Sequence, residues 1–205
     1  MNYIEYIANP HRQCAIVAHG GLWNEAPENS LLSIRRAMEA GYNVVEIDEK
    51  VPSLRDVFEL TCNRIFIHLD IKHRHVIPEV LDYAQKMGIE KQVDFWADLK
   101  TELDLAWIKA NITTHNVPFI ARTHLEHDWR EQAKLALELK PLICEASFRD
   151  LSQVDAMKQQ FHDAGITLWV NTIHSVASPG FTDSAALEDP DKVWGRLLRA
   201  GFSAI

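Results

Sequence analysis

The stretch AIVAHGGLWNEAPENSLLSIRRAMEAGYNVVEID, Ala15 to Asp48, decides the fold. Its pattern predicts a strand that ends near His19, a loop that carries Glu28, a helix, and a second strand that carries Glu46 and Asp48. In a parallel α/β fold the carboxyl ends of successive strands lie on one face, so these four side chains are expected to converge there. The stretch therefore predicts a parallel sheet and a site at its carboxyl edge.

The two acids at the end of the second strand favour a bound cation. Glu46 and Asp48 are two residues apart on a predicted strand, so both carboxylates point to the same side. Two ionised acids at that spacing resist sharing a pocket without a cation between them. Carboxylate oxygens are hard ligands, which favours Mg²⁺ or Ca²⁺ over Zn²⁺. The alternative is an ordinary solvated strand end.

Outside this stretch, apolar β-branched runs alternate with amphipathic segments, which is typical of a parallel sheet. The predicted strands are Cys14–Ala18, Asn43–Asp48, Arg64–Ile71, Gln92–Ala97, Val117–Arg122, Pro141–Ala146, Ile166–Asn171 and Phe202–Ile205. The predicted helices are Ser30–Ala40, Ser53–Thr61, Ile77–Met87, Glu102–Ala110, Glu126–Glu138, Leu151–Ala164 and Asp189–Ala200. Eight strands alternating with helices predict a single (β/α)8 barrel domain over residues 1–205. An open doubly wound sheet is the alternative, because periodicity does not show closure. The segment His174–Leu187 is predicted as a long loop.

The composition of the chain limits the classes of function that are expected. The chain has 205 residues, of which 47% are hydrophobic, and this is enough for one substantial core. Its net charge is −8 and the charges are mixed, so nucleic-acid binding is not expected and an anionic substrate needs a local positive site. No apolar run is long enough for a membrane span, and the opening MNYIEYIANPHRQ is too polar for a signal peptide, so we expect a cytoplasmic protein. Three cysteines, an odd number, suggest buried thiols rather than a disulfide framework.

The third predicted strand, RIFIHLDIK, carries polar residues at alternate positions. Alternation places His68, Asp70 and Lys72 on one face and the aliphatic residues between them on the other. Polar groups inside an apolar strand indicate a function. The alternative is a buried His68–Asp70 pair with Lys72 at the rim.

These motifs together resemble the glycerophosphodiester phosphodiesterase family. Members of that family open with a strand ending in His-Arg-Gly, a loop with Pro-Glu-Asn-Thr or Ser, a helix ending in Gly, and a strand ending in Glu-x-Asp. Here AHGG, PENS (Pro27–Ser30), a helix up to Gly41 and VEID (Val45–Asp48) follow in the same order at similar spacing. The family's next strand carries an acid, usually Glu, two residues before a Lys, and Asp70 and Lys72 match this pair.

The resemblance implies a (β/α)8 barrel that hydrolyses a small-molecule glycerophosphodiester to glycerol phosphate and an alcohol. It implies a divalent cation, Mg²⁺ or Ca²⁺, and assigns its ligands to the second and third strands: Glu46, Asp48 and Asp70. In this reading Lys72 faces the phosphate. His19 is the general acid or base, and Glu28 orients either His19 or a substrate hydroxyl.

Later strand ends supply further candidates. Arg122 closes PFIART and Glu145 lies near the end of LICEASF, so Arg122 is expected to meet a phosphate oxygen and Glu145 a hydroxyl, unless the two pair with each other. The seventh strand, GITLWVN, resembles the family's Trp-x-x-Asn region. Trp169 and Asn171 share a face and are expected to line the site, although a Trp in a barrel strand is also ordinary core. His124, just past the fifth strand, is a further pocket candidate.

The sequence departs from the family pattern at three places. Gly20 stands where the family has Arg, so one phosphate-binding guanidinium is absent. EKVPSLRDVF follows Asp48 almost at once, so the usual hairpin, the second His of the acid/base pair and the insertion are absent. The sequence also stops inside the eighth strand, before the usual final helix. We therefore expect the natural chain to contain further segments after Glu49 and after Ile205.

The departures leave three functional alternatives. If they are genuine, His68 or His124 is expected to replace the second acid/base. A phosphodiester-forming enzyme or a lysophospholipase D-type enzyme would use the same scaffold and cation. A non-catalytic protein that binds phosphodiesters would need no second histidine.

Overall fold

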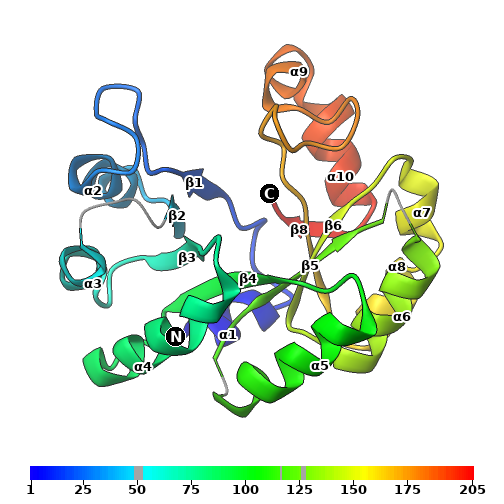
Figure 1. The fold of residues 1–205 in the computed structure, drawn as a ribbon. Helices are drawn as coiled ribbons and strands as arrows, with labels where there is room; N and C mark the ends of the chain where they lie inside the picture. Colours follow the sequence, from blue (N-terminus) through cyan, green and yellow to red (C-terminus); the bar gives the residue numbers. More distant parts are fainter. Residues whose placement is uncertain (49–52, 116, 126–127) are drawn as a thin grey trace.

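The computed structural model describes residues 1–48, 53–115, 117–125 and 128–205, which contain eight parallel strands in sequential order (Figure 1). The strands are β1 (Val17–His19), β2 (Val44–Asp48), β3 (Phe66–Asp70), β4 (Val93–Asp98), β5 (Ile120–His124), β6 (Ile143–Ser147), β7 (Thr167–Trp169) and β8 (Phe202–Ala204). The sheet closes beside β1, where Ala15 is bridged to Ala204 and donates its backbone N–H to Ser203 O at 3.0 Å. This closure confirms the predicted (β/α)8 barrel over the open doubly wound sheet.

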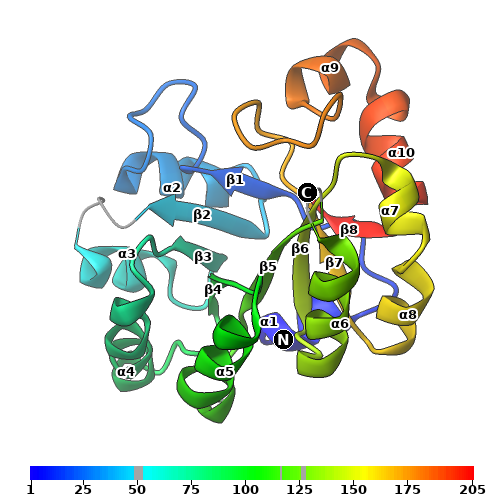
Figure 2. The same cartoon turned by 45° about the vertical axis from the view of Figure 1, so that its right-hand side comes forward.

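Helices surround the strands on the outside of the barrel (Figure 2). They are α2 (Leu31–Glu39), α3 (Leu54–Thr61), η1 (Arg74–Val76), α4 (Ile77–Met87), α5 (Glu102–Asn111), η2 (Thr113–His115), α6 (Trp129–Leu139), α7 (Leu151–Asp155), α8 (Lys158–Asp163), α9 (Asp183–Glu188), η3 (Asp191–Gly195) and α10 (Arg196–Arg199). Sequence signals set several ends: Ser30 caps α2 through Ser33 N, and Gly88 ends α4 in the left-handed region.

Two apolar clusters divide the interior. The larger cluster lies between the strands and the outer helices and includes Ile34, Phe58 and Phe95. The smaller fills one end of the barrel and includes Val44 and Trp169, and α1 (Tyr3–Ala8) supplies Tyr3 and Tyr6 to it. Figures 1 and 2 show α1 at the end of the barrel opposite to α9 and the loop before α2. The smaller apolar cluster and α1 therefore fill one end of the barrel, and the carboxyl ends of the strands lie at the other end.

Some element boundaries differ from the predicted ones. The chain opens with α1, because Asn2 and Glu5 form a capping box; the opening was not predicted to be helical. The predicted loop His174–Leu187 contains most of α9, whose first turn is capped by Thr182. The predicted helix Leu151–Ala164 is interrupted between α7 and α8. The predicted start of the fifth helix at Glu126 lies outside the described residues.

Strand β5 extends past Arg122 to His124, which pairs in register with Ser147 of β6. His124 is therefore inside a strand and not just beyond one. No helix in the described part of the chain is both long and apolar enough to cross a membrane.

Candidate active site

Polar residues follow one another across neighbouring strands inside the carboxyl half of the barrel. In the strand register His19 lies beside Glu46, Glu46 beside His68, and His68 beside Asp94. One layer further along the strands, Asp48 lies beside Asp70. Side chains at every second position point inward, so the register alone brings these groups together.

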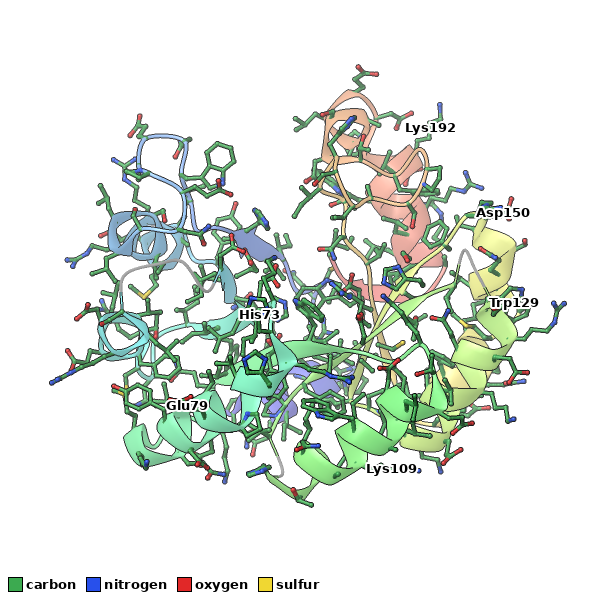
Figure 3. All side chains as sticks on the ribbon, in the orientation of Figure 1. His73, Glu79, Lys109, Trp129, Asp150 and Lys192 are labelled. Carbon is green, nitrogen blue, oxygen red and sulfur yellow. The ribbon has the colours of Figure 1, made fainter. Side chains whose placement is uncertain are left out.

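A cavity of about 1330 Å³ opens at this end of the barrel. Nine of the ten predicted site residues line it: His19, Glu46, Asp48, Asp70, Lys72, Arg122, Glu145, Trp169 and Asn171. The tenth, Glu28, contacts His19 from the loop before α2. Figure 3 shows Glu79 and Lys109 on the outer helices α4 and α5, away from this cavity.

Three carboxylates form a group suited to a metal ion. Ligand oxygens of Glu46, Asp48 and Asp70 lie within 4.8 Å of one another. Glu46 is only 6% exposed; its Oε2 accepts the Gly20 N–H at 2.9 Å, and its Oε1 has no hydrogen-bond partner within the described residues. Burial raises the pKa of the Glu46 carboxyl. A buried, unpartnered oxygen beside two further carboxylates fits a hard divalent cation such as Mg²⁺ or Ca²⁺.

Asn29 fixes one of these carboxylates. Its side-chain amide donates to Asp48 Oδ2 at 3.0 Å, and its carbonyl oxygen accepts the Asp48 backbone N–H at 3.1 Å. Its own backbone N–H donates to Gly20 O at 2.8 Å, with a φ of 55° that Asn tolerates better than most residues. The PENS motif therefore ties the end of β1 to the end of β2.

Lys72 lies between two of the three acids. Its Nζ is 3.4 Å from Asp48 Oδ1 and donates a hydrogen bond to Asp70 Oδ2. Partial burial alone would lower the pKa of Lys72, but the two carboxylates outweigh it and the pKa is raised. The ammonium group therefore balances part of the negative charge in the site.

His19 is placed between two carboxylates. Its Nδ1 is 3.4 Å from Glu28 Oε1 and its Nε2 is 3.7 Å from Glu46 Oε2. The side chain is 42% exposed, so the ring is reachable from the cavity. Indole Nε1 of Trp23 donates to the His19 carbonyl at 3.1 Å and fixes the backbone here.

A side chain at position 20 would meet Glu28. Gly20 has a φ of +62°, and a Cβ placed there would lie 2.9 Å from Glu28 Oε1 and closer still to Glu28 Cγ. A side chain at this position would displace Glu28 from its place beside His19. An arginine at position 20 would therefore require Glu28 to move.

Replacing Gly20 with Ala is expected to destabilise the protein by more than about 1–2 kcal/mol, the cost of a left-handed backbone for an L-residue. The clash with Glu28 adds to that cost. Gly41→Ala is the matched control, because Gly41 has a φ of +82° and no described residue has an atom within 4 Å of the added Cβ. Urea unfolding measures both, and an equal loss of unfolding free energy in the two variants contradicts the clash.

His68 does not pair with Asp70, as the alternative for the third strand would have it. His68 Nδ1 lies 2.7 Å from Oδ1 of the fully buried Asp94, its register neighbour on β4, whereas Asp70 is two residues along the same strand and lies in the next layer. Burial alone would lower the pKa of His68, but the carboxylates of Asp94, Glu46 and Glu145 outweigh it and the pKa is raised. The His68 ring lies 5.4 Å from that of Trp169, which is 3% exposed and belongs to the inner core as well as to the cavity wall.

Arg122 and Glu145 do not pair with each other as the sequence alternative allowed. Both Asp98 on β4 and Glu145 on β6 are register neighbours of Arg122, and its Nε donates to Asp98 Oδ1 at 2.8 Å. Glu145 Oε1 accepts the Asn171 amide at 2.8 Å, and burial raises the pKa of Glu145. Both groups still line the cavity, as does His124.

Four residues of the site are not among the predicted ones: Asn29, Asp94, Trp96 and Asp98. Asn29 belongs to the PENS motif, which gave it no role. The other three alternate along QVDFWAD in the same way as the polar residues of RIFIHLDIK. That period-two signal was sufficient to place them on the inner face of the barrel.

The comparisons with known proteins bear on the fold. A family model described only as a domain of unknown function, DUF4996, matches residues 120–205. No curated protein matches the chain. Many solved structures are similar to it, and many of these are glycerophosphodiester phosphodiesterases.

A glycerophosphodiester phosphodiesterase from Thermotoga maritima has 17% sequence identity and a TM-score of 0.69, over 95% of this chain and 94% of that one. A phosphodiesterase from Oleispira antarctica in complex with the product sn-glycerol-3-phosphate has 18% identity and a TM-score of 0.59, over 95% and 92%. The carboxyl transferase domain of Rhizobium etli pyruvate carboxylase has 12% identity and a TM-score of 0.60, over 98% and 40%. Identities this low establish the barrel fold alone.

Proposed function

We propose that this protein is a metal-dependent phosphodiesterase that hydrolyses glycerophosphodiesters to glycerol phosphate and an alcohol. One observation carries the proposal: three carboxylates within 4.8 Å of one another, with Lys72 against two of them and His19 beside the third. The similarity to solved phosphodiesterases of the same fold supports it, including one that binds sn-glycerol-3-phosphate.

The residues have separate roles in this proposal. Glu46, Asp48 and Asp70 hold a divalent cation, Mg²⁺ or Ca²⁺, which when bound polarises a phosphodiester oxygen and offsets developing negative charge. Lys72 meets a second phosphate oxygen. His19 moves a proton at its Nε2, and Glu28 orients the ring from Nδ1.

The opposite wall of the cavity contacts the rest of the substrate. Arg122 would meet a phosphate oxygen, and Glu145 with Asn171 would hold hydroxyl groups of the glycerol. Trp169 forms an apolar wall beside them. His68 and His124 also line the cavity, which supports either as the second proton-transfer group in this proposal.

The rim of the cavity favours an additional substrate class. Trp23 is 52% exposed and Val176 is 56% exposed, and both line the opening. Exposed apolar side chains beside a polar site are suited to an amphiphilic diester. A lysophospholipase D-type activity, which uses the same cation and histidine, is the second candidate.

Release of glycerol phosphate from glycerophosphocholine is expected to require Mg²⁺ or Ca²⁺ and to stop on addition of a chelator. The cation is also expected to raise the free energy of unfolding by about 2.7 kcal/mol at 100 times its dissociation constant, because it binds only the folded site. Enzyme-coupled detection of glycerol phosphate and thermal unfolding measure the two effects.

The same assay separates the alternatives. Faster release of lysophosphatidic acid from lysophosphatidylcholine than of glycerol phosphate from glycerophosphocholine favours the lysophospholipase D-type activity. Stabilisation by a diester without any product favours a non-catalytic binding protein. Turnover that is unaffected by the chelator contradicts the metal-dependent mechanism.

A further inference from the structure

Trp96 contacts one of the candidate metal ligands directly. It lies on β4, lines the cavity, and donates its indole Nε1–H to Asp70 Oδ1 at 2.6 Å. The other oxygen of Asp70 accepts from Lys72. The indole N–H can only donate, so it holds the carboxylate in one orientation without competing for a cation.

The ring of Trp96 also stacks against Arg122, which lies on the opposite wall of the cavity. The Arg122 guanidinium carbon lies 3.4 Å from the centroid of the Trp96 ring, which is stacking distance. Asp98 holds Arg122 through Nε, and Lys100 Nζ donates to Asp98 from its other side at 3.2 Å. Arg122 is therefore fixed by an aromatic face and by a carboxylate.

We infer that Trp96 is a positioning residue that fixes Asp70 through its indole N–H and Arg122 through its ring face. It thereby sets the geometry between the cation and the phosphate-binding guanidinium. This inference rests on the proposed function, because it assigns Asp70 to the cation and Arg122 to the phosphate. It adds a group that touches neither the cation nor the substrate but orients a partner of each.

The two contacts of Trp96 can be separated by substitution. Trp96→Phe removes the indole N–H and keeps an aromatic face for Arg122. Trp96→Leu removes both contacts. The pair therefore reports the hydrogen bond to Asp70 and the stacking on Arg122 independently.

The chain offers a matched control on its outer layer. Arg74 lies 5.1 Å from the centroid of the Trp107 ring and donates to Asp104 at 3.2 Å, so a tryptophan, an arginine and an aspartate recur together. Trp107 is on α5 and is not among the described residues that line the cavity. Trp107→Phe therefore tests the loss of an indole N–H without a link to the candidate site.

Cation affinity is the first readout, since it does not depend on turnover. Calorimetric titration with Mg²⁺ and with Ca²⁺ is expected to give an affinity about tenfold lower for Trp96→Phe than for the wild type, the usual size of the effect when a group that orients a metal ligand is lost. Trp107→Phe is expected to bind as the wild type does. The melting temperature without cation checks that each variant is folded.

Phosphate affinity is the second readout. At saturating cation, Trp96→Phe is expected to bind sn-glycerol 3-phosphate within about twofold of the wild type, because the stacked arrangement of Arg122 is retained. Trp96→Leu is expected to bind it about five- to tenfold more weakly. If Trp96 had only a structural role, Trp96→Phe would not lower the cation affinity while leaving the phosphate affinity nearly unchanged.

Three outcomes are decisive. Equal cation affinity in Trp96→Phe and the wild type overturns the inference and leaves the proposed function in place. An equal loss in Trp107→Phe overturns it too, because the effect would then not be local. A folded wild-type protein that binds neither cation removes the metal site itself, and the proposed function fails together with the inference.

Discussion

Replacing His19 with Ala is expected to lower kcat for glycerophosphodiester hydrolysis by about 10²- to 10⁴-fold, the usual contribution of a positioned general acid or base. His19 Nε2 lies 3.7 Å from Glu46 Oε2, but His19 is not one of the three proposed metal ligands. The cation affinity of His19→Ala is therefore expected to stay within a few-fold of the wild type. Steady-state kinetics and calorimetric titration measure the two quantities on the same preparation.

A matched histidine sharpens this result. His162 on α8 has a side chain that is 84% exposed, and His162→Ala is expected to change neither kcat nor cation affinity. If His19→Ala keeps the wild-type kcat, His19 does not take part in the proton transfer. Loss of cation binding in that variant would instead assign His19 to the metal site.

Replacing Glu46 with Gln is expected to remove cation binding and to lower kcat/KM by at least about 100-fold. Loss of a group that only orients a metal ligand already costs about 10- to 100-fold, so loss of a ligand charge is expected to cost more. Glu25→Gln is the control, because Glu25 lies in the loop before α2 with a side chain that is 73% exposed. Wild-type cation affinity in Glu46→Gln contradicts the metal site.

The Glu46→Gln variant has a second expected property, a higher melting temperature than the wild type when cation is absent. Burial raises the pKa of Glu46 in the folded state, so its ionisation at neutral pH costs folding free energy, and this cost disappears as the pH falls through that raised pKa. An amide carries no such cost. The gain in stability is therefore expected at neutral pH and is expected to shrink in acid, and a variant that melts lower at neutral pH contradicts this account.

The sequence predicts the barrel well because each βα unit has local signals. Apolar strand runs, helix caps such as Ser30 and glycines such as Gly88 lie next to the elements they delimit. Two unpredicted α-helices are short: α1 and α9 each have six residues and are held by capping interactions rather than by a long amphipathic pattern. Periodicity over so few residues cannot distinguish a helix from a loop.

The candidate site was likewise predicted only in part. The side chains of the first three strands were predicted to converge because their motifs are close in sequence and their alternation is regular. The partners of His68 and Arg122 could not be deduced, because Asp94 and Asp98 meet them through the register of neighbouring strands, and a one-residue shift in register would turn each side chain to the other face. Closure between Ala15 and Ala204 likewise depends on the whole sheet.

The position of Lys72 between Asp48 and Asp70 has a consequence for the order of events at the site. Its ammonium group forms ion pairs with both carboxylates. If Asp48 and Asp70 held a divalent cation through those oxygens, Lys72 would lose its anionic partners and would be available to an incoming phosphate. Under the proposed function, cation and phosphodiester are therefore expected to raise each other's affinity, and by thermodynamic reciprocity to do so by the same factor. When the cation is the more abundant ligand, the binding sequence that begins with the cation is then expected to be the favoured one.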